Sequence, residues 1–433
     1  MLKNKIQKRD PIVMSPLALA LAACGGGGTE NIVPENSEEE TGTNQVFGKQ
    51  TVNVSEIAPF FSVMMVDTAD YNSDGYQDFI VSHGSFPPEE RKSFLPFSLI
   101  NNNGILEIKA IAGNSPSMTH PREGTFTDFN NDGYLDYILV GHGWDTSPFP
   151  GEKNALFFGT REGFIDKSGL LPNYLDFTHS VAVGDLNGDG YEDIYVGNVF
   201  GENRVNPYLL INSGGENFNE VALDEENFGL FSMKYTAAEI ADIDNDGKEE
   251  LIVGAHGGAE QIISGNRIFD YDETAQKMVL KQILPENIFG VSTTVTDIKV
   301  ADLNNDGLLD IVVLSSKDYN GTGLQFLFQE DNGSFTDMTN AVLPEFDLSQ
   351  RWVKFLSIFD IDGDDDLDLL LTQPTARGAN IYYNNDGIFV PNNAEFEIDN
   401  LRNWYQVTTD EATGEQFAAY VNNGILTIDQ IML

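Results

Sequence analysis

Cysteine, basic residues and long apolar runs are scarce in this chain of 433 residues, and each scarcity excludes a class of protein. A single Cys excludes a disulfide framework and any zinc site built on several cysteines. Only 24 Lys and Arg stand against 68 Asp and Glu, a net charge of −44, so we expect no nucleic-acid partner. No run of eighteen apolar residues occurs, and the sequence therefore predicts no membrane-spanning helix.

Apolar residues are nevertheless abundant enough for a large core. Hydrophobic residues make up 41% of the chain and aromatic residues 11%, which is typical of a globular protein rather than a disordered one. A Walker loop, a dinucleotide-binding glycine motif and a Gly-x-Ser-x-Gly turn are all absent from the sequence.

The N-terminus has the features of an export signal. Residues 1–24 combine a basic start, a short apolar stretch and small residues directly before Cys24. This ending resembles the bacterial lipobox, in which the cysteine is lipidated, and the alternative is a plain signal peptide with a chance cysteine. Residues 25–45 are rich in Gly, Ser, Thr, Asn and Glu and indicate a flexible acidic tether. We therefore expect a lipoprotein of the bacterial cell envelope, at the outer membrane, the cell surface or the periplasm, that contacts membrane only through its anchor.

One repeated motif dominates residues 46–433. Six acidic loops have Asp, Asn or Glu at positions 1, 3, 5 and 9, and their first residues are 58, 57, 57, 60 and 58 positions apart. Such a regular period indicates one repetitive domain, where length alone would suggest about three domains. The candidate metal ligands are Asp70, Asn72, Asp74 and Asp78; Asp128, Asn130, Asp132 and Asp136; Asp185, Asn187, Asp189 and Asp193; Asp242, Asp244, Asp246 and Glu250; Asp302, Asn304, Asp306 and Asp310; and Asp360, Asp362, Asp364 and Asp368.

Short apolar runs flank each loop and predict strands. The runs are β-branched and bounded by glycine, and a third run with an Asn- or Gly-rich turn follows, as at 101–104 and 212–215. Four short antiparallel strands in each period predict an all-β protein. Closure of the array into a β-propeller hides the sheet edges that an open array would expose.

The turns predict the number of blades. Six loops define six blades, and a further hairpin at 422–424, without an acidic loop, indicates a seventh, degenerate blade. The stretch 51–57 resembles the last strand of a blade and would complete the seventh across the termini. We expect a seven-bladed β-propeller, with six blades as the alternative.

The composition of the loops favours calcium. Alternate spacing in a tight turn aims the oxygens of positions 1, 3, 5 and 9 at one centre, and glycine at position 6 permits the turn. Six or more oxygen ligands with loose geometry suit calcium better than magnesium. One loop alone would equally be an acidic solvated turn, but six loops in register favour metal. The copy with Asp365 in place of glycine and the copy ending in Glu250 are the least regular.

These loops and their strands resemble FG-GAP/VCBS-type repeats, the calcium-binding blades of integrin α-subunit propellers and of many bacterial surface proteins. The resemblance covers about residues 46–433 and implies calcium between the first and second strands of each blade. Members of this family include adhesion and glycan-binding modules, assembly factors and a few polysaccharide lyases. The resemblance therefore implies a fold and a metal but not one function.

All five histidines map to the end of a propeller opposite the acidic loops. Two long second turns, 85–94 and 144–153, lie at the same end, and long loops on one face of a scaffold often bind ligands. The alternative is that each histidine caps a strand end, and no closely spaced histidine pair supports a transition-metal site. The candidate ligand-binding residues are His83, His120, Arg122, His142, Trp144, His179 and His256.

The sequence thus predicts a calcium-stabilised binding or adhesion propeller that recognises a protein or a glycan through its histidine end. Whether it is an enzyme is left open, and no catalytic residue is assigned. The alternative is a lyase of acidic polysaccharides, in which His, Tyr and Arg would remove a proton beside a uronate carboxylate. A third hypothesis is that the protein is a purely structural part of an envelope assembly.

Overall fold

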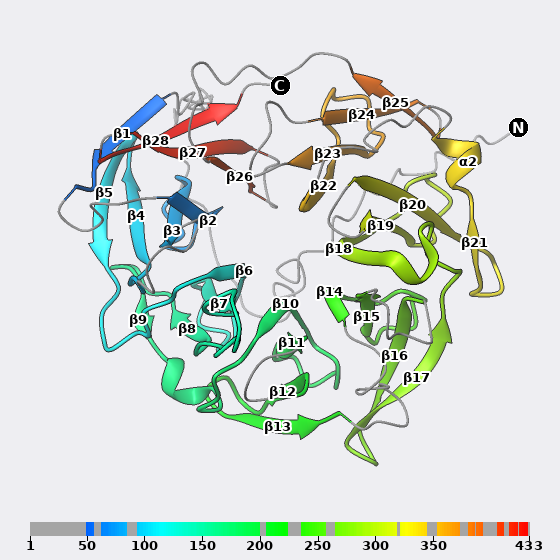
Figure 1. The fold of residues 1–433 in the computed structure, drawn as a ribbon, viewed down its shortest axis with the longest axis horizontal. Helices are drawn as coiled ribbons and strands as arrows, with labels where there is room; N and C mark the ends of the chain where they lie inside the picture. The colour runs from blue at the N-terminus through cyan, green and yellow to red at the C-terminus, as the bar shows by residue number, and fades with distance from the viewer. Residues whose placement is uncertain are drawn as a thin grey trace, which may run out of the picture.

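Seven four-stranded antiparallel sheets stand in a ring around a common axis, as Figure 1 shows. In this computed structural model the described residues are 49–55, 62–84, 93–199, 205–223, 235–256, 265–317, 321–343, 353–372, 380–385, 387–392, 405–410, 415–422 and 424–431. The protein is a seven-bladed β-propeller, and the prediction of seven blades is confirmed. The predicted signal peptide, the tether and Cys24 lie outside the described residues.

Each of the first six blades is a meander of four consecutive strands that runs from the axis outward. The acidic loop joins the first strand to the second, and in five of these blades an Asn- or Gly-rich turn joins the third to the fourth, as predicted. In the fourth blade this turn is 273–276, which has neither residue. The blades are β2 (Ser62–Ala69), β3 (Asp78–Gly84), β4 (Phe97–Asn102) and β5 (Ile105–Ala110); β6 (Pro121–Thr127), β7 (Asp136–Gly141), β8 (Ala155–Phe158) and β9 (Ile165–Asp166); β10 (Thr178–Gly184), β11 (Asp193–Asn198), β12 (Tyr208–Asn212) and β13 (Phe218–Ala222); β14 (Tyr235–Ala241), β15 (Glu250–Ala255), β16 (Arg267–Asp272) and β17 (Lys277–Ile283); β18 (Thr293–Ala301), β19 (Asp310–Lys317), β20 (Thr322–Gln329) and β21 (Phe335–Asp337); β22 (Phe355–Phe359), β23 (Asp368–Thr372), β24 (Asn380–Asn385) and β25 (Ile388–Asn392).

The seventh blade is built from both ends of the chain. Its strands β26 (Tyr405–Thr409), β27 (Gln416–Asn422) and β28 (Ile425–Ile431) come from the C-terminal part, and β1 (Lys49–Asn53) adds the outermost strand. Strand β1 pairs antiparallel with β28, and Val54 N–H donates to the Gly424 carbonyl at 2.8 Å. The prediction that an N-terminal strand closes the ring is therefore confirmed.

The core lies between neighbouring blades, because each sheet is buried on both faces. Strands β7, β11 and β15 are buried at every residue, whereas the outer strand β5 is mostly exposed or half-buried. Aromatic and β-branched side chains fit such pleated surfaces, and they fill the space between adjacent sheets. Among the described residues helix is confined to α2 (Thr339–Val342) and two single 3-10 turns, 168–170 and 290–292. No helix in this part of the chain is long and apolar enough to cross a membrane.

Five inner strands share a bulge that the sequence did not predict. In each, the pairing with the second strand slips by one residue near the end away from the acidic loop. A bulge bends a strand and re-aims the side chains beside it, so it shapes the end of the propeller where the histidines lie. The slips occur between Val63 and Met65, Pro121 and Glu123, Thr178 and Ser180, Tyr235 and Ala237, and Val295 and Asp297.

Closure by β1 predicts that the stability of the protein depends strongly on this strand. Truncation through Val54 removes the ladder to β28 and a fully buried side chain that alone contributes about 1.5–3 kcal/mol. We expect a lower melting temperature in thermal unfolding followed by circular dichroism. Truncation of residues 1–48 is the control, because it keeps all of β1. Equal melting of the two truncated proteins would contradict closure by this strand.

Candidate functional site

The six acidic loops share one backbone shape. In the first loop, Asp70 Oδ1 accepts the N–H of Asp74 at 2.9 Å and Asp70 Oδ2 accepts the N–H of Gly75 at 2.8 Å. Gly75 has a φ of 89°, and its counterparts in the next four loops share this left-handed conformation. In the sixth loop Asp365 adopts it with a φ of 73°, so the irregular copy keeps the same turn at a cost in strain.

The residue at position 9 is a buried carboxylate that ties the loop to its blade. Asp136 is 0% exposed, and it accepts the N–H of Phe129 at 3.0 Å and the N–H of Gly159 at 2.8 Å. Burial raises the pKa of Asp136 to about 8, and the neighbouring loop carboxylates raise it further. The same burial raises the pKa of Asp78 and Asp193 to about 8. A nearby cation would relieve the cost of this buried charge.

The donor sets of five loops fit a hard cation. They contribute carboxylate and amide oxygens, and in the sixth loop Asp360, Asp362 and Asp368 bring oxygens within 4.8 Å of one another. Oxygen ligands in a flexible turn match the coordination of calcium.

The fourth loop already contains a cation from the protein itself. Lys281 Nζ, from β17, lies 2.7 Å from Asp244 Oδ2 and 2.6 Å from Glu250 Oε1. A third oxygen, Asp270 Oδ1, is 3.1 Å away. Burial opposes the charge of Lys281, but its bonds to these carboxylates outweigh burial and raise its pKa. The carboxylates of Asp242, Asp244 and Asp246 lie within 4.8 Å of one another, so a metal would have to compete with this ammonium group.

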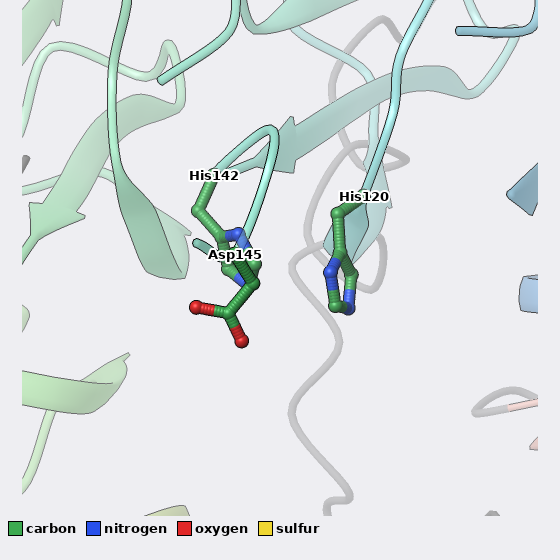
Figure 2. Close-up of side chains that lie close together, drawn as sticks. All are labelled: His120, His142 and Asp145. Atoms are coloured by element: carbon green, nitrogen blue, oxygen red, sulfur yellow. The ribbon is translucent and has the colours of Figure 1, made fainter. Parts of the chain in front are cut away.

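At the opposite end of the propeller, three of the five histidines converge. The ring centroids of His120 and His142 are 4.2 Å apart, and those of His142 and His179 are 5.2 Å apart. Phe177 stacks on His142 at 4.6 Å, which extends the row across the second and third blades. Figure 2 shows the carboxylate of Asp145 beside His142, with the ring of His120 opposite. Ligand atoms of His120, His142 and Asp145 lie within 4.8 Å of one another.

The other two histidines lie apart from this row. His83, near the end of β3, packs against Phe94 at 4.5 Å and Phe97 at 6.0 Å. His256 follows β15, and its Nδ1 lies 3.2 Å from the Thr294 hydroxyl. A positive charge on His256 lowers the pKa of His179. All five histidines therefore share one end, but only three form a cluster.

Glu152, which the sequence analysis missed, holds the segment that carries His120. Its carboxylate accepts the N–H of His120 at 3.1 Å and the N–H of Thr119. A paired contact with Asp176 fixes Glu152 in turn, with N–H to carbonyl distances of 2.9 and 2.8 Å. Any side chain at Gly141 would collide with Glu152, since its Cβ would lie 2.3 Å from Oε1. Backbone and carboxylate together thus set the position of His120.

Arg122 and Lys354 bring positive charge to the axis. Lys354, just before β22, donates from Nζ to the Arg122 carbonyl at 2.6 Å, across the ring from the second blade. Burial lowers the pKa of Lys354 well below its usual value, and Arg122 lowers it further. Burial also raises the pKa of Glu123 to about 8, with Asp297 acting in the same direction. Acidic and basic side chains from several blades are therefore buried near one another.

Burial keeps the clustered imidazoles neutral. Desolvation lowers the pKa of His120 to about 3, and Arg122 and Lys354 lower it further. His142 is 1% exposed, and burial followed by the neighbouring histidines lowers its pKa well below the usual value. His142 Nδ1 lies 3.0 Å from the Gly143 carbonyl, which can only accept, so Nδ1 carries the proton. Trp144, predicted at this end, is half-buried in the turn that follows.

Comparison with known proteins supports an FG-GAP propeller-type protein. Residues 128–196 and 302–371 match the FG-GAP-like repeat family. Each stretch begins at the first residue of one acidic loop and ends in the strand that follows the next acidic loop. The chain is 28% identical over 218 residues to integrin alpha-8 of Gallus gallus, covering 44% of this chain and 21% of that protein. It is 34% identical over 86 residues to integrin alpha-4 of Xenopus laevis, covering 18% and 8%. The chain thus spans about a fifth or less of the length of these relatives.

The contact between Lys281 and the fourth loop predicts an effect of one substitution. Lys281→Gln leaves Glu250, which is 2% exposed, without its cation and should destabilise the protein by about 3 kcal/mol in a chelator. Lys277→Gln is the matched control, an exposed lysine on the same strand. Chemical denaturation measures both, and equal stability of the two variants would show that Lys281 is not the cation of this loop.

Proposed function

We propose that the protein is a calcium-stabilised cell-surface propeller that binds a protein or glycan partner through its histidine end. The observation that carries this proposal is the convergence of His120, His142 and His179 at the end opposite the acidic loops. Loop side chains and neutral imidazoles placed on a rigid ring are suited to recognition. The similarity to integrin alpha chains supports a binding role and a location outside the cell.

Calcium is the proposed ion of the loops. Five loops offer oxygen ligands around a buried carboxylate, and the fourth loop holds Lys281 instead. The same buried carboxylates pin the second and third strands, so an ion in the loop would stabilise the whole blade. The proposed lipid anchor at Cys24 would tether the propeller to a bacterial envelope, as the lipobox-like sequence suggests.

The lyase alternative gains no support from the histidines. A general base works best when its pKa lies near the working pH, and the pKa of His120 is about 3. Binding without turnover is therefore the function that the cluster favours. Release of unsaturated uronates from acidic polysaccharides, followed by ultraviolet absorbance, would revive the lyase.

Removal of calcium should lower the melting temperature, and the effect should grow with pH. Each occupied loop contributes about 2.7 kcal/mol when calcium is about 100 times its dissociation constant. The buried carboxylates have a pKa of about 8 when folded against a usual value of 3.8, so the folded state retains protons that the unfolded state has lost. The metal-free protein therefore loses stability as pH rises through this range, whereas calcium binds the ionised form.

The measurement is the difference in melting temperature between calcium and EDTA at about pH 5 and about pH 8. We expect a larger difference at the higher pH. Equal melting temperatures in calcium and EDTA at both pH values would contradict calcium binding by the loops. The binding function would then still be tested by the adhesion assay.

Partner binding should depend on the histidine end. Beads coated with the folded protein are tested for adhesion to cells before and after protease or glycosidase treatment, which separates a protein partner from a glycan. Arg122→Ala together with His179→Ala should weaken adhesion at least about tenfold, a loss of about 1.4 kcal/mol. Tyr76→Ser is the control, an exposed residue in the first acidic loop. Loss of adhesion with the control variant alone would place the binding surface at the opposite end.

A further inference from the structure

A group of metal-ligating side chains lies at the histidine end of the propeller, opposite the acidic loops. His120 precedes β6, and His142 and Asp145 follow β7 within the same blade. One ligand atom from each residue lies within 4.8 Å of the other two. Figure 2 shows the two rings and the carboxylate gathered in one place. The group contains two nitrogen donors and one oxygen donor, unlike the oxygen-only loops.

The surroundings of His142 and His120 are those of oriented ligands. His142 donates from Nδ1 to the Gly143 carbonyl at 3.0 Å, which leaves the lone pair of Nε2 available. Metal-bound histidines usually donate their second ring nitrogen to a carbonyl or carboxylate in this way. The backbone of His120 is held by Glu152, a side chain that is 7% exposed. Contacts from outside the group thus hold the ring of His142 and the backbone of His120.

The turn after His142 is shaped to return Asp145 toward the rings. Gly143 has a φ of 71°, and a Cβ there would lie 2.6 Å from the Gly151 carbonyl oxygen, so the close approach needs glycine. Asp145 is exposed to solvent, whereas His142 is buried. Ligand atoms around one zinc-sized ion lie at most about 4.4 Å apart. Three ligand atoms within 4.8 Å of one another are therefore close to the spacing that such an ion needs.

We propose that His120, His142 and Asp145 bind a divalent transition-metal ion of the zinc class, with at least one coordination position left open. Two imidazoles and one carboxylate suit such an ion, whereas calcium prefers oxygen ligands alone. The inference goes beyond the proposed function and does not rest on it, because the site needs neither the partner nor calcium.

The charges nearby make Asp145 the decisive ligand. Arg122 lies close enough to lower the pKa of His120 and His142, and its positive charge opposes a second cation. The Asp145 carboxylate offsets that charge locally. Loss of the carboxylate should therefore weaken the site strongly, even though the imidazoles remain.

The test is zinc binding to the full chain by equilibrium dialysis, in an excess of calcium that occupies the acidic loops. We expect one zinc equivalent for the unaltered protein. Asp145→Asn should weaken binding at least about tenfold, and His120→Gln should do the same, because even outer-layer changes cost about 10–100-fold. Asp331→Asn, an exposed aspartate in the turn between β20 and β21, is the matched control and should bind zinc normally.

A second readout is the visible spectrum of the cobalt-substituted protein, which should show nitrogen and oxygen ligation in the unaltered chain and lose intensity in Asp145→Asn. Thermal melts check that each variant is folded. Because Asp145 is exposed, Asp145→Asn should fold even if His120→Gln is unstable, and it then provides the test alone. Absence of bound zinc in calcium, or binding equal in Asp145→Asn and Asp331→Asn, overturns the proposal. Neither result depends on the adhesion assay.

Discussion

The buried carboxylate at position 9 of each acidic loop is the contact on which the regular shape of the blades depends. In five blades this carboxylate accepts an N–H from the third strand or from the residue directly after it. In five blades it also accepts the N–H of the residue that follows the first loop residue. One carboxyl group thus fixes a turn, a second strand and a third strand together. Ionising that group away from water is unfavourable unless a positive charge is near, and Lys281 supplies this charge in the fourth blade.

The two ends of the ring have different chemistry because the strands alternate in direction. Turns that follow the inner strands carry acidic oxygens. The turns at the opposite end carry imidazoles, and they include the long turn 144–153 with Trp144 and Glu152. Near the axis, Lys354 of the sixth blade touches Arg122 of the second, so residues 232 positions apart share one electrostatic environment. A substitution near one inner strand therefore alters the electrostatic environment of a blade across the ring.

The local pattern of the sequence predicted the blades because the loops and hairpin turns are short-range features. The spacing of the first loop residues, the apolar runs and the 422–424 turn were enough for seven sheets and for the end that carries the histidines. Lys281 could not be predicted, since it meets Asp244 only after two further strands of the same blade. The positions of the bulges, the role of Glu152 and the clustering of only three histidines depend on how adjacent blades pack. No local sequence pattern encodes that packing.

The shared seventh blade has a consequence for synthesis. Strand β1 is synthesised before the other described strands and its partner β28 after them, so the two cannot pair until the other six blades have been made. An incomplete chain would leave that seam open and present unpaired backbone to proteases and chaperones. Pairing of β1 with β28 therefore becomes possible only after the other six blades have been synthesised.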